Sequence, residues 1–167
     1  MASIIVVDDK PKFLALHKGA LEAAGHDVIP APGSSAGEVY ETLKNRLGGK
    51  RDTADFLYLD VHLGNDMFGG IHLYNMLVGG GYRYSWSHTL VVSTLACDPI
   101  NLAAWDTTSA REDYLIRVFV ETARIPYENV FRALSGGHGA VMKRIADLAK
   151  QPLDTRCTVC DQLLEWR

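Results

Sequence analysis

The chain has 167 residues, of which 47% are hydrophobic and 22% are charged, and its formal net charge is −3. A chain of this size and composition is expected to form one globular domain with a single core, which excludes disordered, collagen-like and disulfide-scaffold proteins. The slight acidic excess offers no basic surface to the phosphate backbone of nucleic acids, so nucleic-acid binding is not expected.

The beginning of the chain alternates short apolar runs with helical periodicity. Residues 4–7 form a β-branched run that is too short for a helix and predicts a strand. Pro11 then opens a predicted helix that ends at Gly25, and residues 26–30 predict a second, weaker strand. The apolar positions of this helix are taken to be Phe13, Leu16, Ala20, Leu21 and Ala24.

The same alternation continues through the middle of the chain. Ser34 and Ser35 are typical helix caps, and the helix that follows is closed by Gly48. Its apolar face consists of Val39, Tyr40, Leu43 and Leu47. Residues 56–59 predict a third strand that is buried on both faces of a sheet. A helix containing Ile71, Tyr74 and Leu77 follows, and residues 90–92 predict a fourth strand.

The second half is less regular. Residues 99–105 and 111–123 have helical spacing, residues 129–131 predict a short fifth strand, and residues 139–150 predict an amphipathic helix that Pro152 ends. Strands that alternate with helices indicate an α/β fold, with a parallel sheet covered by helices on both faces. We expect one domain over residues 1–150, with an enlarged region at 98–128, and a C-terminal tail over residues 151–167.

Polar side chains follow the predicted strands directly. Ligands of an open parallel sheet bind at the carboxyl ends of its strands, so the candidate site residues are Asp8, Asp9, Asp60, Ser93, Thr94 and Arg132. If the first and third strands are neighbours, Asp9 and Asp60 lie close together and need a proton or a cation between them. Mg²⁺ suits such a site because it binds carboxylate and phosphate oxygens. Aspartates that merely cap turns are the alternative, but the agreement of three strand ends favours phosphoryl chemistry.

Three segments of the sequence resemble the receiver domain of two-component response regulators over about residues 3–150. They are IIVVDDKPKF, FLYLDVHLG and LVVST, which are similar to the first, third and fourth strands of that family. The resemblance implies a flavodoxin-like, doubly wound sheet of five parallel strands in the order 2-1-3-4-5.

The resemblance also implies roles for individual residues. Asp60 would accept a phosphoryl group, and Asp8, Asp9, Asp60 and the backbone carbonyl of His62 would bind Mg²⁺. Ser93, or alternatively Thr94, would be the hydroxyl that contacts the phosphoryl group.

Two positions depart from the family pattern. The family has a lysine followed by a proline at the end of the fifth strand, where this chain reads NVFRAL and has Arg132 as the nearest cation. Arginine binds phosphate through a planar fork and is not equivalent to lysine. The aromatic residue that the family has three positions earlier is replaced by Asn129.

The resemblance therefore predicts a stand-alone response regulator rather than an enzyme. Such a phosphoprotein would receive its phosphoryl group from a histidine kinase or a phosphotransfer protein and would signal to a downstream protein partner. A second copy of the chain is a further partner, which the apolar tail would suit. One alternative is a pseudo-receiver that binds proteins without phosphorylation. A more remote one is an aspartate-nucleophile phosphatase, with His62 in the position of the general acid.

Apolar runs and cysteines bear on the location of the protein. No apolar run reaches the roughly 20 residues that a membrane helix needs, and MASIIVVDD lacks the features of a secretory signal. We therefore expect a cytoplasmic protein, with no membrane partner and with reduced thiols. Cys157 and Cys160 have the spacing of a metal or redox pair, but one pair with Cys97 far away favours an ordinary tail over a zinc site.

Overall fold

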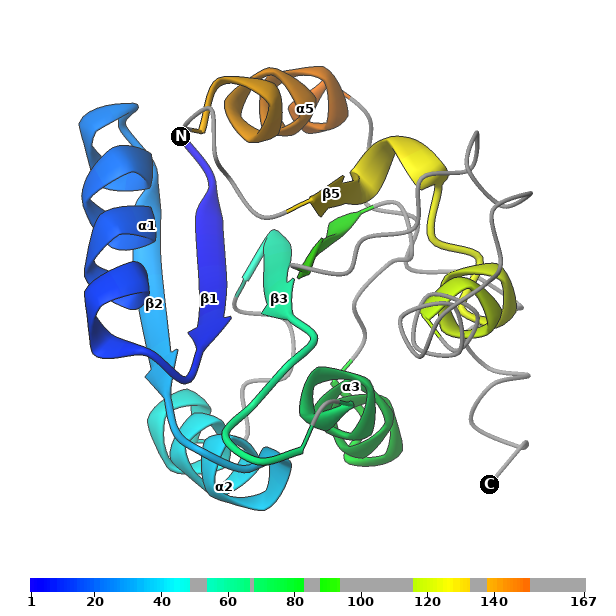
Figure 1. Cartoon of the computed structure of the whole chain (residues 1–167). Coiled ribbons are helices and arrows are strands. Elements are labelled where there is room, and N and C mark those ends of the chain that lie inside the picture. The colour runs from blue at the N-terminus through cyan, green and yellow to red at the C-terminus, as the bar shows by residue number, and fades with distance from the viewer. Residues whose placement is uncertain (49–53, 67, 83–87, 94–115, 133–137, 151–167) are drawn as a thin grey trace.

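Strands and helices alternate along the chain (Figure 1). A computed structural model describes residues 1–48, 54–66, 68–82, 88–93, 116–132 and 138–150. The elements in chain order are β1 (Ser3–Asp8), α1 (Pro11–Ala23), β2 (Asp27–Pro32), α2 (Ala36–Leu47), β3 (Phe56–Asp60), α3 (Gly69–Gly79), β4 (Thr89–Ser93), a 3-10 turn (Tyr127–Asn129), β5 (Val130–Arg132) and α5 (Gly139–Ala149). Residues 116–122 form a further helix.

The five strands form one parallel sheet in the order β2-β1-β3-β4-β5. This is the doubly wound, flavodoxin-like order, so the predicted fold class is confirmed. Val7 lies opposite Leu59, and Asp60 lies opposite Val92. The carboxyl ends of β1, β3 and β4 therefore lie beside one another, at the edge of the sheet where this architecture places ligands.

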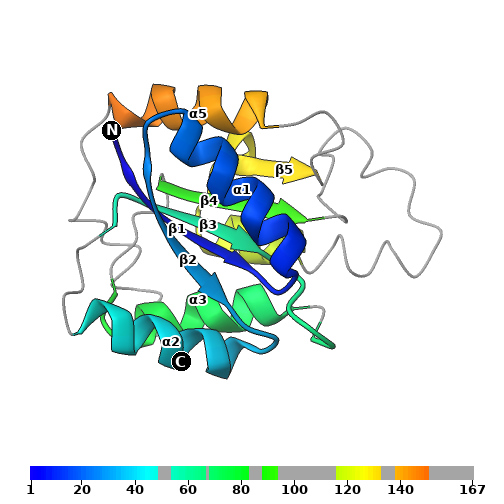
Figure 2. The ribbon, with the colours of Figure 1, turned by 90° about the vertical axis from the view of Figure 1, so that its left-hand side faces the viewer.

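Helices cover both faces of the sheet (Figure 2). One core lies under α1 and α5 and includes Ile4, Val6, Phe56 and Tyr58, whereas the second core lies under α2, α3 and the helix at 116–122. Successive residues of a strand point to opposite faces, so even-numbered residues of β1 and β3 face α1 and α5. Burial on both faces explains why these strands appear in the sequence as continuous apolar runs.

The predicted ends of α2 are confirmed. Ser35 is its N-cap residue, and the Ser35 hydroxyl accepts a hydrogen bond from the backbone N–H of Glu38 (3.2 Å). Gly48 follows the last turn in a left-handed conformation, with φ of 54°, and its backbone N–H bonds to the carbonyl of Lys44. These contacts satisfy backbone groups that have no partner within the helix.

The predicted apolar face of α1 is confirmed at Leu21 and wrong at Phe13 and Leu16. Phe13 and Leu16 are 44% and 53% exposed, whereas Leu14, His17 and Leu21 are buried. The true inward stripe has spacing i, i+3 and i+7, but its central member is polar. A search for apolar residues at helical spacing therefore predicts a face that is shifted by one residue, to the neighbouring Phe13 and Leu16.

The end of the chain is described in part. Asn129 closes the 3-10 turn before β5 rather than beginning the strand. The predicted helical piece at 99–105, the tail at 151–167 and the three cysteines Cys97, Cys157 and Cys160 lie outside the described residues. Among the helices that are described, none has both the length and the apolar character that crossing a membrane requires.

Candidate functional site

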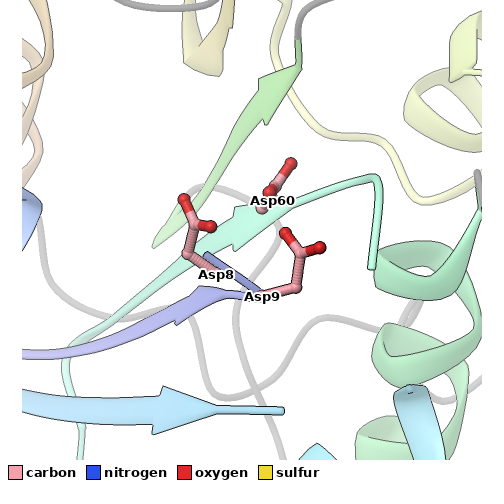
Figure 3. A group of neighbouring side chains, drawn as sticks. All are labelled: Asp8, Asp9 and Asp60. Atoms are coloured by element: carbon pink, nitrogen blue, oxygen red, sulfur yellow. The ribbon is translucent and has the colours of Figure 1, made fainter. Parts of the chain in front are cut away.

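Three aspartates meet at the carboxyl edge of the sheet (Figure 3). Asp8 ends β1, Asp9 follows it, and Asp60 ends the neighbouring β3. One carboxylate oxygen from each lies within 4.8 Å of the others. The predicted closeness of Asp9 and Asp60 is thus confirmed, and it follows from the direct pairing of β1 with β3. We call these three residues the carboxylate pocket.

Each carboxylate is held by a hydrogen bond. The Oδ1 atom of Asp8 accepts from the backbone N–H of Lys10 at 2.8 Å. The Oδ2 atom of Asp9 accepts from the backbone N–H of Gly64 at 2.9 Å. The Oδ1 atom of Asp60 accepts from the backbone N–H of His62 at 3.3 Å. These bonds orient three like charges toward a common point, which is unfavourable unless a proton or a cation shares the site.

The repulsion among these carboxylates affects the pKa of Asp60. Burial and then the nearby charge of Asp8 raise the pKa of Asp60 to about 7, and Asp9 adds to the rise. The backbone hydrogen bond from His62 and the charge of Lys10 act in the opposite direction. A carboxyl group with this pKa is partly protonated at neutral pH, so a cation in the pocket would favour its ionised form.

The segment between β3 and α3 is shaped to approach the pocket. Gly64 has φ of 59°, and a Cβ atom there would lie 2.1 Å from the carbonyl oxygen of Ser34. A Cβ atom on Gly70 would lie 2.1 Å from the carbonyl oxygen of Asp60. Only glycine permits these approaches of backbone to backbone. The first turn of α3 can therefore pack directly on the end of β3.

The donor chemistry of the pocket fits a hard divalent cation. Its three side chains offer carboxylate oxygens, which are the ligands that Mg²⁺ and Ca²⁺ prefer. The pocket could thus hold a metal ion. The predicted contribution of the His62 carbonyl stays a prediction. The His62 ring is exposed and lies with Nε2 at 2.7 Å from the carbonyl oxygen of Gly64, to which an Nε2–H would donate.

The remaining predicted site residues lie at the ends of β4 and β5. Ser93 and Arg132 are opposite each other in the backbone register of these strands. Their side chains and the whole of Thr94 lie outside the described part of the chain, so their roles stay predictions.

Asn129, at the position where the sequence resemblance leads us to expect an aromatic residue, is fully buried. Its Nδ2 donates to the carbonyl of Thr89 at 3.0 Å, and its Oδ1 accepts from Arg144 Nε at 2.6 Å. This side chain therefore joins β4 to α5 through polar contacts.

Sequence reasoning missed His17 on α1. His17 is 7% exposed, and its Nε2 lies 3.2 Å from Oδ2 of Asp8. The sequence signal that could have found it is the stripe Leu14, His17 and Leu21, in which a polar residue stands between two apolar ones at helical spacing. A buried imidazole in such a stripe needs polar partners.

Comparison with known proteins shows the fold of the chain. No protein-family model and no curated protein matches the sequence. A two-component response regulator of the LuxR family, from Aurantimonas sp. SI85-9A1, is similar over 100% of this chain and 98% of its own, with a TM-score of 0.51 and 17% identity. The chain has the receiver fold. The carboxylate pocket of this receiver fold resembles the phospho-acceptor site of response regulators in its place and its residues.

Two further solved structures are similar. A fusion protein that includes the trimeric coiled coil of yeast Spc42 matches over 99% of this chain and 93% of its own, with a TM-score of 0.52 and 14% identity. NtrX from Brucella abortus, solved with ADP, is matched over 99% of this chain and 33% of its own, with a TM-score of 0.42 and 16% identity. At 14% identity the likeness of the Spc42 fusion protein is one of fold.

Proposed function

We propose that this chain is a response regulator that accepts a phosphoryl group on Asp60 from a histidine kinase or a phosphotransfer protein. The observation that carries the proposal is the convergence of Asp8, Asp9 and Asp60 at the carboxyl edge of a sheet with receiver topology. The chain would act as a phosphorylated signalling protein in a two-component system rather than as an enzyme. Its output would be a contact with a downstream protein.

The proposed transfer is a nucleophilic displacement at phosphorus. A carboxylate oxygen of Asp60 forms the new P–O bond while the P–N bond of a phosphohistidine breaks, and the electron pair of that bond stays on the departing nitrogen. The imidazole leaves as a neutral group when its other ring nitrogen already carries a hydrogen. Asp8, Asp9, Asp60 and the His62 carbonyl would hold Mg²⁺, which supplies positive charge to the phosphoryl oxygens when it is bound. The ionised form of Asp60 is the reactive one, and because the pKa of Asp60 is raised to about 7, a cation in the pocket would increase the ionised fraction.

The signal would come from the charge of the acyl phosphate. A phosphoryl group adds close to two negative charges and three strong acceptors at the end of β3. Ser93 or Thr94 would offer a hydroxyl to it, and Arg132 would offer a cation. Because arginine reaches phosphate as a planar fork, we expect its contact to differ from that of the family's lysine. Attraction of these groups would move the surface near β4 and β5.

One observation favours a second function, that of a pseudo-receiver which binds proteins without phosphorylation. Asn129 stands where the family has an aromatic residue, and its hydrogen bonds to Thr89 and Arg144 hold it in the core. A side chain that is fixed in this way cannot rotate with the phosphorylation state as a loosely packed one can. The chain would then present a constant surface to its partner.

Formation of an adduct tests the proposal. The protein is incubated with Mg²⁺ and either acetyl phosphate or beryllofluoride, and the adduct is followed by intact mass and by ¹⁹F NMR respectively. We expect an adduct in the wild type and in Asp147→Asn, which changes an exposed aspartate of α5, and none in Asp60→Asn. Absence of an adduct in the wild type would leave the pseudo-receiver. Steady hydrolysis of a phosphomonoester that His62→Ala reduces would instead indicate a phosphatase.

A further inference from the structure

His17 lies between the carboxylate pocket and the core under α1 and α5. It is one of the few polar residues buried in the described part of the chain, and it stands on the inward stripe of α1 between Leu14 and Leu21. An apolar side chain would satisfy the packing requirement at this position. Burial of an imidazole costs free energy unless its nitrogens find partners, so the contacts of the ring explain its place here.

Both ring nitrogens of His17 have polar partners. Nε2 faces Oδ2 of Asp8 at 3.2 Å. Nδ1 lies 2.7 Å from Nε2 of His138 and 3.2 Å from the hydroxyl of Tyr58. His138 is the N-cap residue of α5, and Tyr58 is on β3 two residues before Asp60. The imidazole thus contacts three elements and connects the pocket to the first turn of α5.

The chemistry of the partners orients the ring. An ionised carboxylate only accepts hydrogen bonds, so Nε2 of His17 must carry the hydrogen that points to Asp8. Nδ1 is then free to accept from the Tyr58 hydroxyl or from Nε2–H of His138. The Tyr58 hydroxyl lies 3.2 Å from Nδ1, and a tyrosine hydroxyl can donate a hydrogen bond there. The partners on the far side of the ring therefore support the hydrogen bond to Asp8.

Among the three aspartates of the carboxylate pocket, Asp8 depends most on hydrogen bonds from the protein. Its exposed fraction is 5%, so water contributes little to its solvation, and its second oxygen is already occupied by the backbone N–H of Lys10. The N–H of His17 supplies a second donor and fixes the plane of the carboxylate that faces Asp9 and Asp60. Partners of this kind tune a metal site as strongly as some of its direct ligands do.

We propose that His17 is a positioning residue of the carboxylate pocket, which holds Asp8 through Nε2–H and accepts at Nδ1 from Tyr58 or His138. The inference rests on the proposed function in that Asp8 serves a Mg²⁺ site. Its structural part, the Nε2–H hydrogen bond, exists without any metal. The two parts can be measured separately.

The first measurement is Mg²⁺ affinity by isothermal titration calorimetry. His17→Met removes the donor and keeps an apolar volume, and we expect it to weaken Mg²⁺ binding about 10-fold. His17→Gln keeps an N–H donor near the position of Nε2 and should restore the affinity to within about threefold of the wild type. Leu14→Met is the matched control, because it alters the same buried stripe of α1 by a volume-conserving change and should leave the affinity unchanged.

The second measurement is the hydrogen position on His17 in the metal-free protein. Long-range ¹H–¹⁵N NMR spectra of the wild type report which ring nitrogen is protonated, and we expect a hydrogen on Nε2. This readout needs no variant, so it decides the question even if His17→Met does not fold. A hydrogen on Nδ1 alone would overturn the inference, as would equal Mg²⁺ affinity in His17→Met and the wild type.

The two proposals fail in different ways. If the wild type binds no Mg²⁺, the metal site of the proposed function is wrong, and the hydrogen position on His17 alone then supports or overturns its contact with Asp8. If the wild type binds Mg²⁺ but His17→Gln is as weak as His17→Met, the proposed function stands and the positioning role is wrong.

Discussion

Replacement of Asp60 by asparagine should stabilise the metal-free protein. The pKa of Asp60 rises from 3.8 to about 7 on folding, because burial and the charge of Asp8 disfavour the ionised form. A rise of about 3 units corresponds to at most about 4 kcal/mol, at roughly 1.4 kcal/mol per unit. We expect Asp60→Asn to raise the free energy of unfolding by roughly 1–2 kcal/mol. The value is below the maximum because the pocket lies at an edge of the sheet, where water screens charges, and because the repulsion is shared among Asp60, Asp8 and Asp9.

The sign of this effect gives it a characteristic pH dependence. The folded state binds the Asp60 proton more tightly than the unfolded state, so this residue costs no stability below about pH 4. Its cost grows as the pH rises toward about 7 and is constant above that. The gain from Asp60→Asn should therefore be near zero at about pH 4 and largest at pH 7 and above.

Thermal unfolding in EDTA at constant ionic strength measures the difference. At neutral pH we expect Tm to rise by about 2–8 °C in Asp60→Asn, given about 2–4 °C per kcal/mol for a chain of this size. The exposed Asp147→Asn should leave Tm nearly unchanged. Excess Mg²⁺ should stabilise the wild type and reduce the gap. A lower Tm in Asp60→Asn, or a gain that does not vary between about pH 4 and pH 8, would refute the reasoning.

Three further substitutions test the framework around the pocket. Gly70→Ala forces a Cβ atom to within 2.1 Å of the Asp60 carbonyl, and urea unfolding should show a loss of about 3 kcal/mol or more together with weaker adduct formation. Asn129→Ala removes the hydrogen bond to the carbonyl of Thr89 and the hydrogen bond from Arg144, and should cost about 1–3 kcal/mol. Ser35→Ala removes the cap of α2 and should lower the free energy of unfolding by about 1 kcal/mol.

Each of these three substitutions has a control variant in the same chain. Gly19→Ala lies on the exposed side of α1 with nothing within 4 Å of the added atom, and should raise the free energy of unfolding by roughly 0.5–1 kcal/mol. Equal effects at Gly19 and Gly70 would contradict the steric argument. Asn129→Asp, which keeps an acceptor for Arg144, should cost less than Asn129→Ala if the contact with α5 dominates. Capping is wrong as an explanation if Ser35→Asp is as unstable as Ser35→Ala.

Local patterns predict the alternation of strands and helices, whereas the order of the strands in the sheet comes from the resemblance to receiver domains. The runs at 4–7 and 56–59 are continuous because β1 and β3 are buried on both faces, so period and length identify them as central strands. Their final aspartates lie together because parallel neighbours share a carboxyl edge. The three carboxylates of the candidate site could therefore be predicted, but the groups around them could not.

Local patterns failed where two elements pack against each other. The inward face of α1 contains His17, and an apolar search passes over it to the exposed Phe13 and Leu16. Asn129 is likewise polar and was identified only as a departure from an aromatic position. Its burial depends on Arg144, which α5 brings to it from later in the chain.

Hydrophobic period predicts the α/β fold from the sequence, and strand polarity places Asp8, Asp9 and Asp60 at one edge of the sheet once β1 and β3 are neighbours. The groups that hold those carboxylates depend on tertiary packing. The rotation of α1 about its axis brings His17 under Asp8, and the packing of α5 brings His138, 121 positions away, against the same ring. These contacts depend on how the helices pack on the sheet. A polar residue can be buried there because hydrogen bonds from its partners replace those to water.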